Sequence, residues 1–511
     1  TSAPAASGGD TTGGGAADAI TYSLTADPRA LDPAYFDDGE SAVVSCNIHE
    51  GLYQYGAKDA KVAPCLAVDL PEISDDGKVY TIKLREGVKF HDGAEFNAEA
   101  VKKSIERQLE PNRNSDMPYA SFVFGEKEAG NGVETVEAVD PTTVKITLRA
   151  ASTPFLKNLA MALASPIVSP AAIDAATPGQ PIAEPKGTGP YKFVDWTKGA
   201  SVTLVANEDY WGGTPKTKYL EMRVVPETSQ RSVLLETGEI DFAYDVLPSD
   251  VERLNGNENL QVLEDVSFKT FYLTLNCTSE DTPALQDARV RMAIECAIDK
   301  DTLCDAVMYG YAEPIGTLLA PGVFGYSESV PANTYDVERA KELLAEAGYA
   351  DGFSMSIWVQ SSDQTRQEAC IVIQDMLREV GIEASVEPMD SQVMDDRMVK
   401  GEDFGMSSSM WYNLMGDADY AYYSNISPES TSNFAHYNNP ELLQELLDAR
   451  SIQDDTQRAA VYDHIGQVLS EERPYIPMWS YNNLVGASKT QEGFQMNPVS
   501  AYRYENVVVY E

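Results

Sequence analysis

The chain has 511 residues, which allows about three structural units, or two lobes of which one is subdivided. Its 80 acidic against 38 basic residues give a formal net charge of −42, so its surface repels phosphate backbones and anionic lipids, and we exclude nucleic acid as a partner. No stretch of the sequence approaches the roughly 18 apolar residues that a membrane span needs.

The N-terminal segment has a composition that cannot bury apolar surface. Residues 1–17 are Thr, Ser, Ala, Pro and Gly with one Asp. We expect a disordered tether over residues 1–19, left after removal of a signal peptide and carrying a lipid anchor. A frayed chain end is the alternative.

The first two hundred residues predict strands and turns more than helices. An Asp-Asp-Gly turn at 75–77 precedes alternating apolar residues at 80–84, and an Asp-Pro-Thr turn separates two alternating segments within 133–148. Residues 97–107 have apolar positions at helical spacing. Residues 202–204 return to the strand pattern. This half indicates an α+β arrangement with antiparallel pairing.

The second half has the pattern of a parallel sheet. The sequence predicts a helix over 336–348, a strand over 353–359, a helix opened by a capping box at 365–368, and a strand from Ile382. Strand, helix and strand with short loops form a βαβ unit, whose ligands gather beyond the carboxyl ends of the strands. Residues 360–366 therefore lie at such an end, beside a helix N-terminus that favours anions.

Together the two halves predict a two-lobed α/β (mixed α+β) protein whose chain crosses between lobes near 268–275 and again near 481–489. The predicted organisation is a tether over 1–19, a first lobe over 20–270 with an inserted subdomain at about 46–165, a second lobe over 271–482, and a C-terminal segment, 483–511, that returns to the first lobe.

The six cysteines match no metal-ligand spacing. Their even number permits disulfides, but six cysteines allow 15 connectivities and the sequence does not choose among them. Cys296 and Cys370 lie in apolar helical patterns, so we expect them to be buried free thiols.

The sequence carries few of the groups that covalent or metal catalysis needs. The sequence has no HExxH, P-loop, GxSxG or EF-hand pattern, and only four histidines. We therefore expect a protein that is not an enzyme and holds no cofactor or metal. A secreted hydrolase with an unrecognised pair of carboxylates is the alternative from another class.

Eight short motifs in a fixed order identify a family. Over residues 21–511 the chain resembles the extracytoplasmic solute-binding proteins of family 5, the peptide/opine/nickel class. The motifs are LDP at 31–33, EGLY at 50–53, YTIKLREGVKFHDG at 80–93, GTGPY at 187–191, NEDYW at 207–211, GEID at 238–241, RVRMAI at 289–294 and YDVERAKELL at 335–344.

The resemblance implies the fold and the function. It implies a class II (cluster C) periplasmic-binding-protein fold with an extra subdomain in the first lobe, whose two lobes close over a solute by hinge motion. It implies an extracytoplasmic receptor, periplasmic or a cell-surface lipoprotein, that acts as a monomer. Its partners would be a peptide ligand and the membrane permease of an ATP-driven (ABC) importer, and it would meet the membrane only through an N-terminal lipid anchor.

The resemblance also implies where the amine of a peptide would bind. In peptide-binding relatives a carboxylate shortly after a Gly/Ser-Trp segment receives the free amine. The matching segment contains Trp411, which is itself the first aromatic candidate for a ligand contact, with core packing as its alternative. Leu414 stands where the acid is expected. Asp417, or else Asp419, would then take this role in a longer loop, and the alternative is that either acid caps a turn.

Three aromatic residues and one arginine complete the implied site. Tyr119, Trp479 and Tyr481 lie in segments that contact peptide in oligopeptide receptors, and core packing is the alternative for each. Arg366 lies in the first turn of a predicted helix, where its charge opposes the helix dipole. With that N-terminus it would face a ligand carboxylate, as a basic residue does in dipeptide-binding relatives; a solvated surface arginine is the alternative.

The identity of the solute stays open among several ligands of this family. Peptide is the first choice, because aromatic residues are candidates for the cleft. A nickel chelate, haem, a sugar or an opine are the alternatives, and the small number of histidines argues against nickel.

Overall fold

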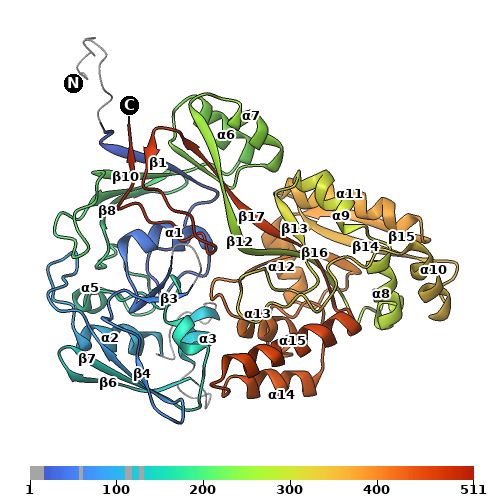
Figure 1. Ribbon diagram of the computed structural model, residues 1–511, viewed down its shortest axis with the longest axis horizontal. Helices are drawn as coiled ribbons and strands as arrows, with labels where there is room; N and C mark the ends of the chain where they lie inside the picture. The colour runs from blue at the N-terminus through green and yellow to red at the C-terminus, as the bar shows by residue number, and fades with distance from the viewer. Residues whose placement is uncertain (1–15, 57–60, 110–117, 126–131, 511) are drawn as a thin grey trace.

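The computed structural model describes residues 16–56, 61–109, 118–125 and 132–510. It has two lobes of mixed α/β structure that lie side by side, with two long strands passing between them, as Figure 1 shows. The predicted two-lobed α/β fold is confirmed. Most of the predicted tether, residues 1–15, lies outside the described residues.

One mixed sheet of eleven strands runs through both lobes. Its strands are β1 (Ala19–Leu24), β8 (Tyr191–Thr197), β9 (Ser201–Ala206), β10 (Tyr219–Val224), β11 (Phe242–Tyr244), β12 (Leu260–Leu275), β13 (Ala312–Pro314), β14 (Phe353–Gln360), β15 (Ile382–Met389), β16 (Met406–Tyr412) and β17 (Tyr475–Ser488). Their order is β15-β14-β16-β12-β17-β11-β1-β10-β9-β8, with β13 paired to β17 off this path.

Strands β12 and β17 carry the chain between the lobes. They pair antiparallel along almost their whole length, from Leu260 opposite Ser488 to Thr274 opposite Tyr475. The register shifts between Val266 and Thr270, so β12 has a bulge where it passes the junction. The predicted crossing at 268–275 lies within β12, and the one at 481–489 ends one residue beyond β17. The lobe boundaries stay a prediction.

The first lobe contains a smaller sheet of its own. Strands β4 (Glu72–Ile73), β5 (Val79–Lys83), β7 (Thr143–Leu148) and β6 (Val133–Asp140) pair antiparallel in that order. The pair of β6 and β7 is the predicted hairpin at 133–148, and β5 is the strand predicted after the turn at 75–77. Two short pairs, β2 (Tyr53–Tyr55) with β3 (Val62–Pro64) and β18 (Gln491–Glu492) with β19 (Val508–Val509), complete the strands. The helices of this lobe are α1 (Gly39–Ile48), α2 (Ala98–Gln108), α3 (Pro118–Phe124), α4 (Phe155–Asn158), α5 (Pro170–Ala175), α6 (Thr228–Glu236), η1 (Pro248–Asp250) and α7 (Val251–Asn255).

The second lobe contains the predicted βαβ unit. Its helices are η2 (Pro283–Gln286), α8 (Ala288–Cys296), α9 (Lys300–Met308), α10 (Val337–Glu346), α11 (Gln364–Arg378), α12 (Ser391–Val399), α13 (Ala418–Ile426), α14 (Pro440–Ala449) and α15 (Asp455–Glu472). Strands β14 and β15 pair in parallel on either side of α11. The predicted start of α11 was wrong by two residues: Asp363, not Thr365, is the N-cap, and its carboxylate accepts from the Arg366 N–H at 2.9 Å.

A large apolar core joins the small sheet of the first lobe to the C-terminal helices. Tyr80 of β5 and Phe155 of α4 belong to the same buried cluster as Tyr422 of α13 and Tyr462 of α15. The helices α13–α15, orange to red in Figure 1, therefore contact the first lobe as well as the second.

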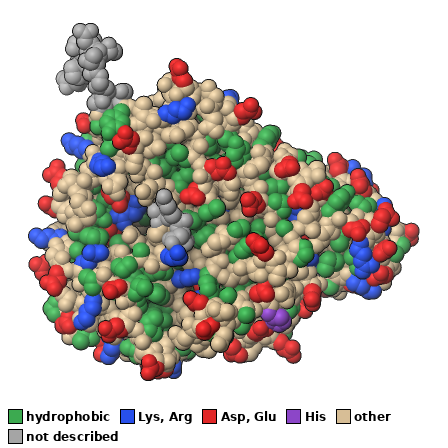
Figure 2. Space-filling view, viewed as in Figure 1, with side chains coloured by type: hydrophobic (Ala, Val, Ile, Leu, Met, Phe, Trp, Pro, Cys, Tyr) green, Lys and Arg blue, Asp and Glu red, His purple; other side chains and the backbone are tan. Residues whose placement is uncertain are grey.

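The cysteines are free, and Cys296 and Cys370 are buried as predicted. Acidic side chains are scattered over the face drawn in Figure 2, in keeping with the net charge of −42. Within the described ranges, no helix combines the length and the apolar character that crossing a membrane requires.

Candidate ligand-binding cleft

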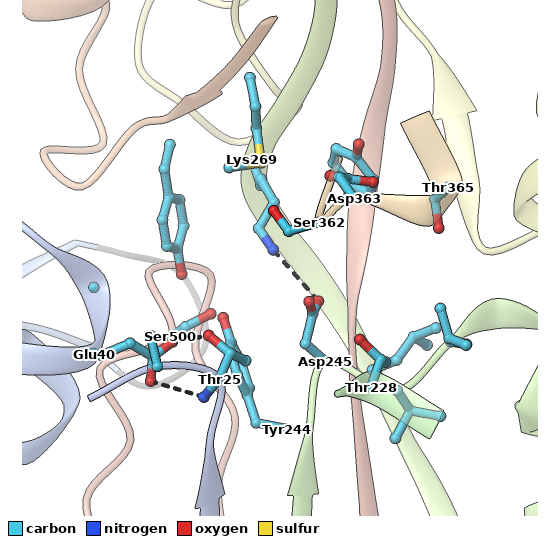
Figure 3. Close-up of a pocket in the computed structure, with 18 of the residues that line it drawn as sticks. Thr25, Glu40, Thr228, Tyr244, Asp245, Lys269, Ser362, Asp363, Thr365 and Ser500 are labelled. Carbon is cyan, nitrogen blue, oxygen red and sulfur yellow. Dashed lines mark hydrogen bonds and ion pairs between the residues drawn. The ribbon is translucent and has the colours of Figure 1, made fainter. Parts of the chain in front are cut away.

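A cavity of about 820 Å³ lies where the two lobes face each other. Its lining comes from the first lobe, from both crossing strands, from the C-terminal ends of β14 and β16 in the second lobe, and from residues 499–501. Figure 3 shows side chains from these elements pointing toward a common space. Pockets of this size, between about 300 and 1,000 Å³, commonly hold small-molecule ligands.

Glu40 and Thr25 form part of the first-lobe wall. Asp38 caps α1 by accepting from the Ser41 N–H at 2.8 Å, and this places Glu40 in the first turn. The Glu40 carboxylate accepts from the Thr25 hydroxyl and from the Thr25 N–H at 3.3 Å. Burial raises the pKa of Glu40 to about 7, although the bonds from Thr25 oppose the shift.

Asp245 follows β11 with a left-handed backbone, φ 54°. This conformation is uncommon for a residue with a side chain and is tolerated best by Asn and Asp. Arg231, 1% exposed, fixes it by donating to the carbonyl oxygens of Tyr244 at 2.8 Å and of Asp245 at 3.2 Å, and to the Thr228 hydroxyl at 2.9 Å. The loop that presents the Asp245 carboxylate is therefore held from behind.

Lys269 projects from the bulge of β12 toward Asp245. Its Nζ lies 3.5 Å from Asp245 Oδ1, the dashed line in Figure 3, and is 5.8 Å and 5.6 Å from the ring centres of Tyr412 and Tyr481. Burial opposes the charge of both groups, yet their attraction raises the pKa of Lys269 and, with help from Arg231, lowers that of Asp245. Both side chains therefore stay charged at neutral pH.

Arg366 lies in the second-lobe wall, at the start of α11. It is 3% exposed, and its guanidinium donates to Asp363 at 2.6 Å, to the Gln360 amide oxygen at 2.9 Å and to the Ser408 carbonyl at 3.3 Å. Burial opposes its charge, but Asp363 outweighs burial and raises its pKa. Arg366 thus lines the cleft and also holds the loop before α11.

Among the seven residues predicted from the sequence, Arg366 and Tyr481 line the cleft. Trp479, also on β17, is fully buried in the second-lobe core, where its ring centre lies 4.5 Å from that of Phe271. Core packing, the alternative stated for Trp479, therefore describes its position.

Trp411 and Tyr119 lie close together, but neither lines the cleft. Side chains alternate along β16, so Met410 and Tyr412 face the cleft while Trp411 faces the opposite side. There Trp411 and Tyr119 both pack on Tyr420, with ring centres 5.3 Å and 5.5 Å from it. The structure brings these two predicted residues together in an aromatic cluster.

Asp417 and Asp419 lie in the interior, each paired with cations. Asp417 caps α13, and its carboxylate is 2.9 Å from Arg458 and 3.2 Å from Lys157. Asp419 is 2.8 Å from Arg450, and burial raises its pKa. Both side chains are at most 3% exposed, so their charges are already balanced within the protein.

Sequence reasoning missed Glu40, Asp245, Lys269 and Tyr412. Lys269 is the single charged residue in the stretch from Phe268 to Leu275, and that isolation was the available signal. The described residues contain no group of three or more His, Cys, Asp or Glu side chains arranged to hold a metal ion.

Comparisons with known proteins find relatives over almost the whole chain. A glutathione-binding protein, GsiB of Escherichia coli K12, is 31% identical over 501 residues, covering 96% of this chain and 94% of its own. DppA of Helicobacter pylori, solved with the peptide STSA, is 28% identical with a TM-score of 0.84, covering 96% of this chain and 98% of its own. AgaA of A. tumefaciens R10, solved with agropinic acid, is 26% identical with a TM-score of 0.80, covering 96% and 99%.

The family model described as bacterial extracellular solute-binding proteins, family 5 Middle, matches residues 61–433. The match spans most of the chain and confirms the resemblance inferred from the eight motifs. The chain belongs to the family 5 bacterial extracellular solute-binding proteins.

Proposed function

We propose that this chain is the solute receptor of an ATP-driven importer, capturing peptides between its lobes and delivering them unchanged to the membrane permease. The observation that carries the proposal is the cleft itself, whose two walls and floor present charges of both signs around a space of about 820 Å³. A zwitterionic solute of a few residues matches such a lining. Support also comes from the relatives, one named for glutathione and one solved with a four-residue peptide.

Closure of the lobes explains how binding is signalled. A ligand shifts an equilibrium between open and closed forms only if it binds one form better. Here Asp245 and Glu40 come from one lobe and residues 361–366 from the other, so a ligand that touches both walls stabilises the closed form. The permease would then recognise the closed shape.

We propose a revised set of ligand contacts. Arg366, with the N-terminus of α11, and Tyr481 are retained from the sequence-based prediction, and Glu40, Asp245, Lys269 and Tyr412 are added. Trp411, Tyr119, Asp417, Asp419 and Trp479 are assigned to the packing that supports the cleft.

The receptor would work outside the cytoplasm as a monomer, held to the membrane by a lipid anchor through the N-terminal tether. It would need no cofactor and perform no chemistry on its solute.

The test is the identity of the solute. Native mass spectrometry of the purified protein, followed by denaturation, should release a peptide, and calorimetry should show that this peptide binds again. Release of an opine, a sugar, haem or a nickel chelate would refute the peptide assignment. Conversion of a supplied peptide into products would favour the secreted hydrolase instead.

A further inference from the structure

Lys269 and Asp245 form a loosely bonded ion pair at the floor of the cleft. The 3.5 Å separation is at the outer limit of a hydrogen bond, and Asp245 is the hydrogen-bond partner of the Lys269 ammonium among the described residues. The Asp245 side chain is 54% exposed and that of Lys269 is 14% exposed. An ammonium has three donors and a carboxylate about four acceptor positions, so both groups keep bonding capacity directed at the cleft.

The two charges are held in place without consuming that capacity. Arg231 bonds to the backbone around Asp245 and to the Thr228 hydroxyl, so the orientation of the Asp245 loop is fixed while its carboxylate stays available. The bulge of β12 and the rings of Tyr412 and Tyr481 restrict Lys269 in the same way. A pre-positioned pair loses little freedom when a ligand binds.

The spacing of the pair selects among ligands. The ends of an extended peptide are separated by about 3.3–3.6 Å for each residue, so the amine and carboxylate of an α-peptide lie too far apart to meet both groups at once. An α-amino-acid head carries its ammonium and carboxylate on one carbon and can bind Asp245 and Lys269 together. In a γ-glutamyl peptide this head stays free, because the side-chain carboxyl forms the peptide bond.

We propose that the Lys269–Asp245 pair receives an α-amino-acid head group and that the preferred ligands are therefore γ-glutamyl peptides. This inference rests on the proposed peptide-receptor function and names its substrate class. The ligand carboxylate would bind the Lys269 ammonium and the ligand ammonium would bind the Asp245 carboxylate. Figure 3 shows these two side chains joined by a dashed line. The name of the glutathione-binding relative is in keeping with it, since glutathione is a γ-glutamyl peptide.

The test compares two isomers on the wild-type protein. Calorimetry with γ-Glu-Ala-Gly and its α-linked isomer Ala-Gly-Glu holds composition and net charge constant, while only the γ isomer carries an ammonium and a carboxylate on one carbon. We expect the γ isomer to bind at least about tenfold more tightly, because the α isomer leaves one charge-assisted contact unmade. Equal affinities, or a preference for the α isomer, overturn the head-group assignment and leave the peptide receptor standing. Absence of binding by both isomers and by a panel of two- to four-residue peptides overturns both proposals.

Substitutions of Lys269 and Asp245 test whether these two residues cause the preference for the γ isomer. Lys269→Gln and Asp245→Asn should each weaken binding of the γ isomer at least about tenfold and reduce the preference over the α isomer. The matched controls Lys218→Gln and Asp195→Asn, at exposed positions outside the cleft lining, should change neither value. Retention of the full preference in both cleft variants, with melting temperatures unchanged, overturns the assignment.

Discussion

Substitution of Asp417 distinguishes a packing role from a ligand-binding role. In Asp417→Asn the carboxylate shared by Arg458 and Lys157 is replaced by a neutral amide, while Arg458 remains 3% exposed. Removing one partner of a buried ion pair leaves the other charge uncompensated and costs about 3–5 kcal/mol. Natural proteins are stable by only about 5–15 kcal/mol, so the loss is large.

The assay is thermal unfolding together with calorimetry of peptide binding. Asp417→Asn should lower the melting temperature by several degrees, and at temperatures where it is folded its peptide affinity should stay within a few-fold of wild type. The matched control is Asp455→Asn, whose carboxylate lies 3.5 Å from the same Arg458 but is 72% exposed. It should change the free energy of unfolding by no more than about 0.5 kcal/mol. An unchanged melting temperature combined with lost peptide affinity would refute the reasoning and place Asp417 at the ligand.

Three further outcomes follow from the same contacts. In the native protein the pKa of Glu40 is raised to about 7, so its carboxyl holds a proton to higher pH than in the unfolded chain, and the free energy of unfolding falls as pH rises from about 5 to about 7. Glu40→Gln should reduce that fall, measured by unfolding at a series of pH values. The same dependence on pH in the variant and the wild type would contradict this. Trp479→Ala should lower the free energy of unfolding by about 3–5 kcal/mol, whereas Tyr481→Phe should weaken peptide binding with little change in stability. Calorimetry and unfolding measure both properties in each variant. Weaker binding in the first variant and lower stability in the second, with the other property unchanged in each, would contradict these assignments. Arg231→Ala should weaken peptide binding, because Arg231 holds the backbone that positions the Asp245 carboxylate. A peptide affinity equal to that of wild type would show that Arg231 is not needed to position Asp245.

The local elements were largely predictable from the sequence. The hairpin at 133–148 and the unit of β14, α11 and β15 follow from alternating and helical apolar patterns, which depend on neighbouring residues only. The start of α11 was misplaced because two residues nearby can cap a helix, and the choice of Asp363 over Thr365 also involves its ion pair with Arg366.

The composition of the site was less predictable, because it depends on residues far apart in the sequence. Asp417 looked available for a ligand, since nothing local shows that Lys157, 260 positions earlier, balances its charge. Lys269 owes its direction to a bulge in β12, a feature of strand register that the sequence of one strand does not reveal. Trp411 and Tyr412 are adjacent, and only the pairing of β16 decides which of them faces the cleft.

A crystal structure of the peptide complex tests the central claim most directly. We expect the peptide to lie between the lobes, with polar contacts no longer than about 3.5 Å to Asp245 or Glu40 on one side and to residues 361–366 on the other. A peptide that contacts one lobe alone, or binds outside this cleft, would contradict the account.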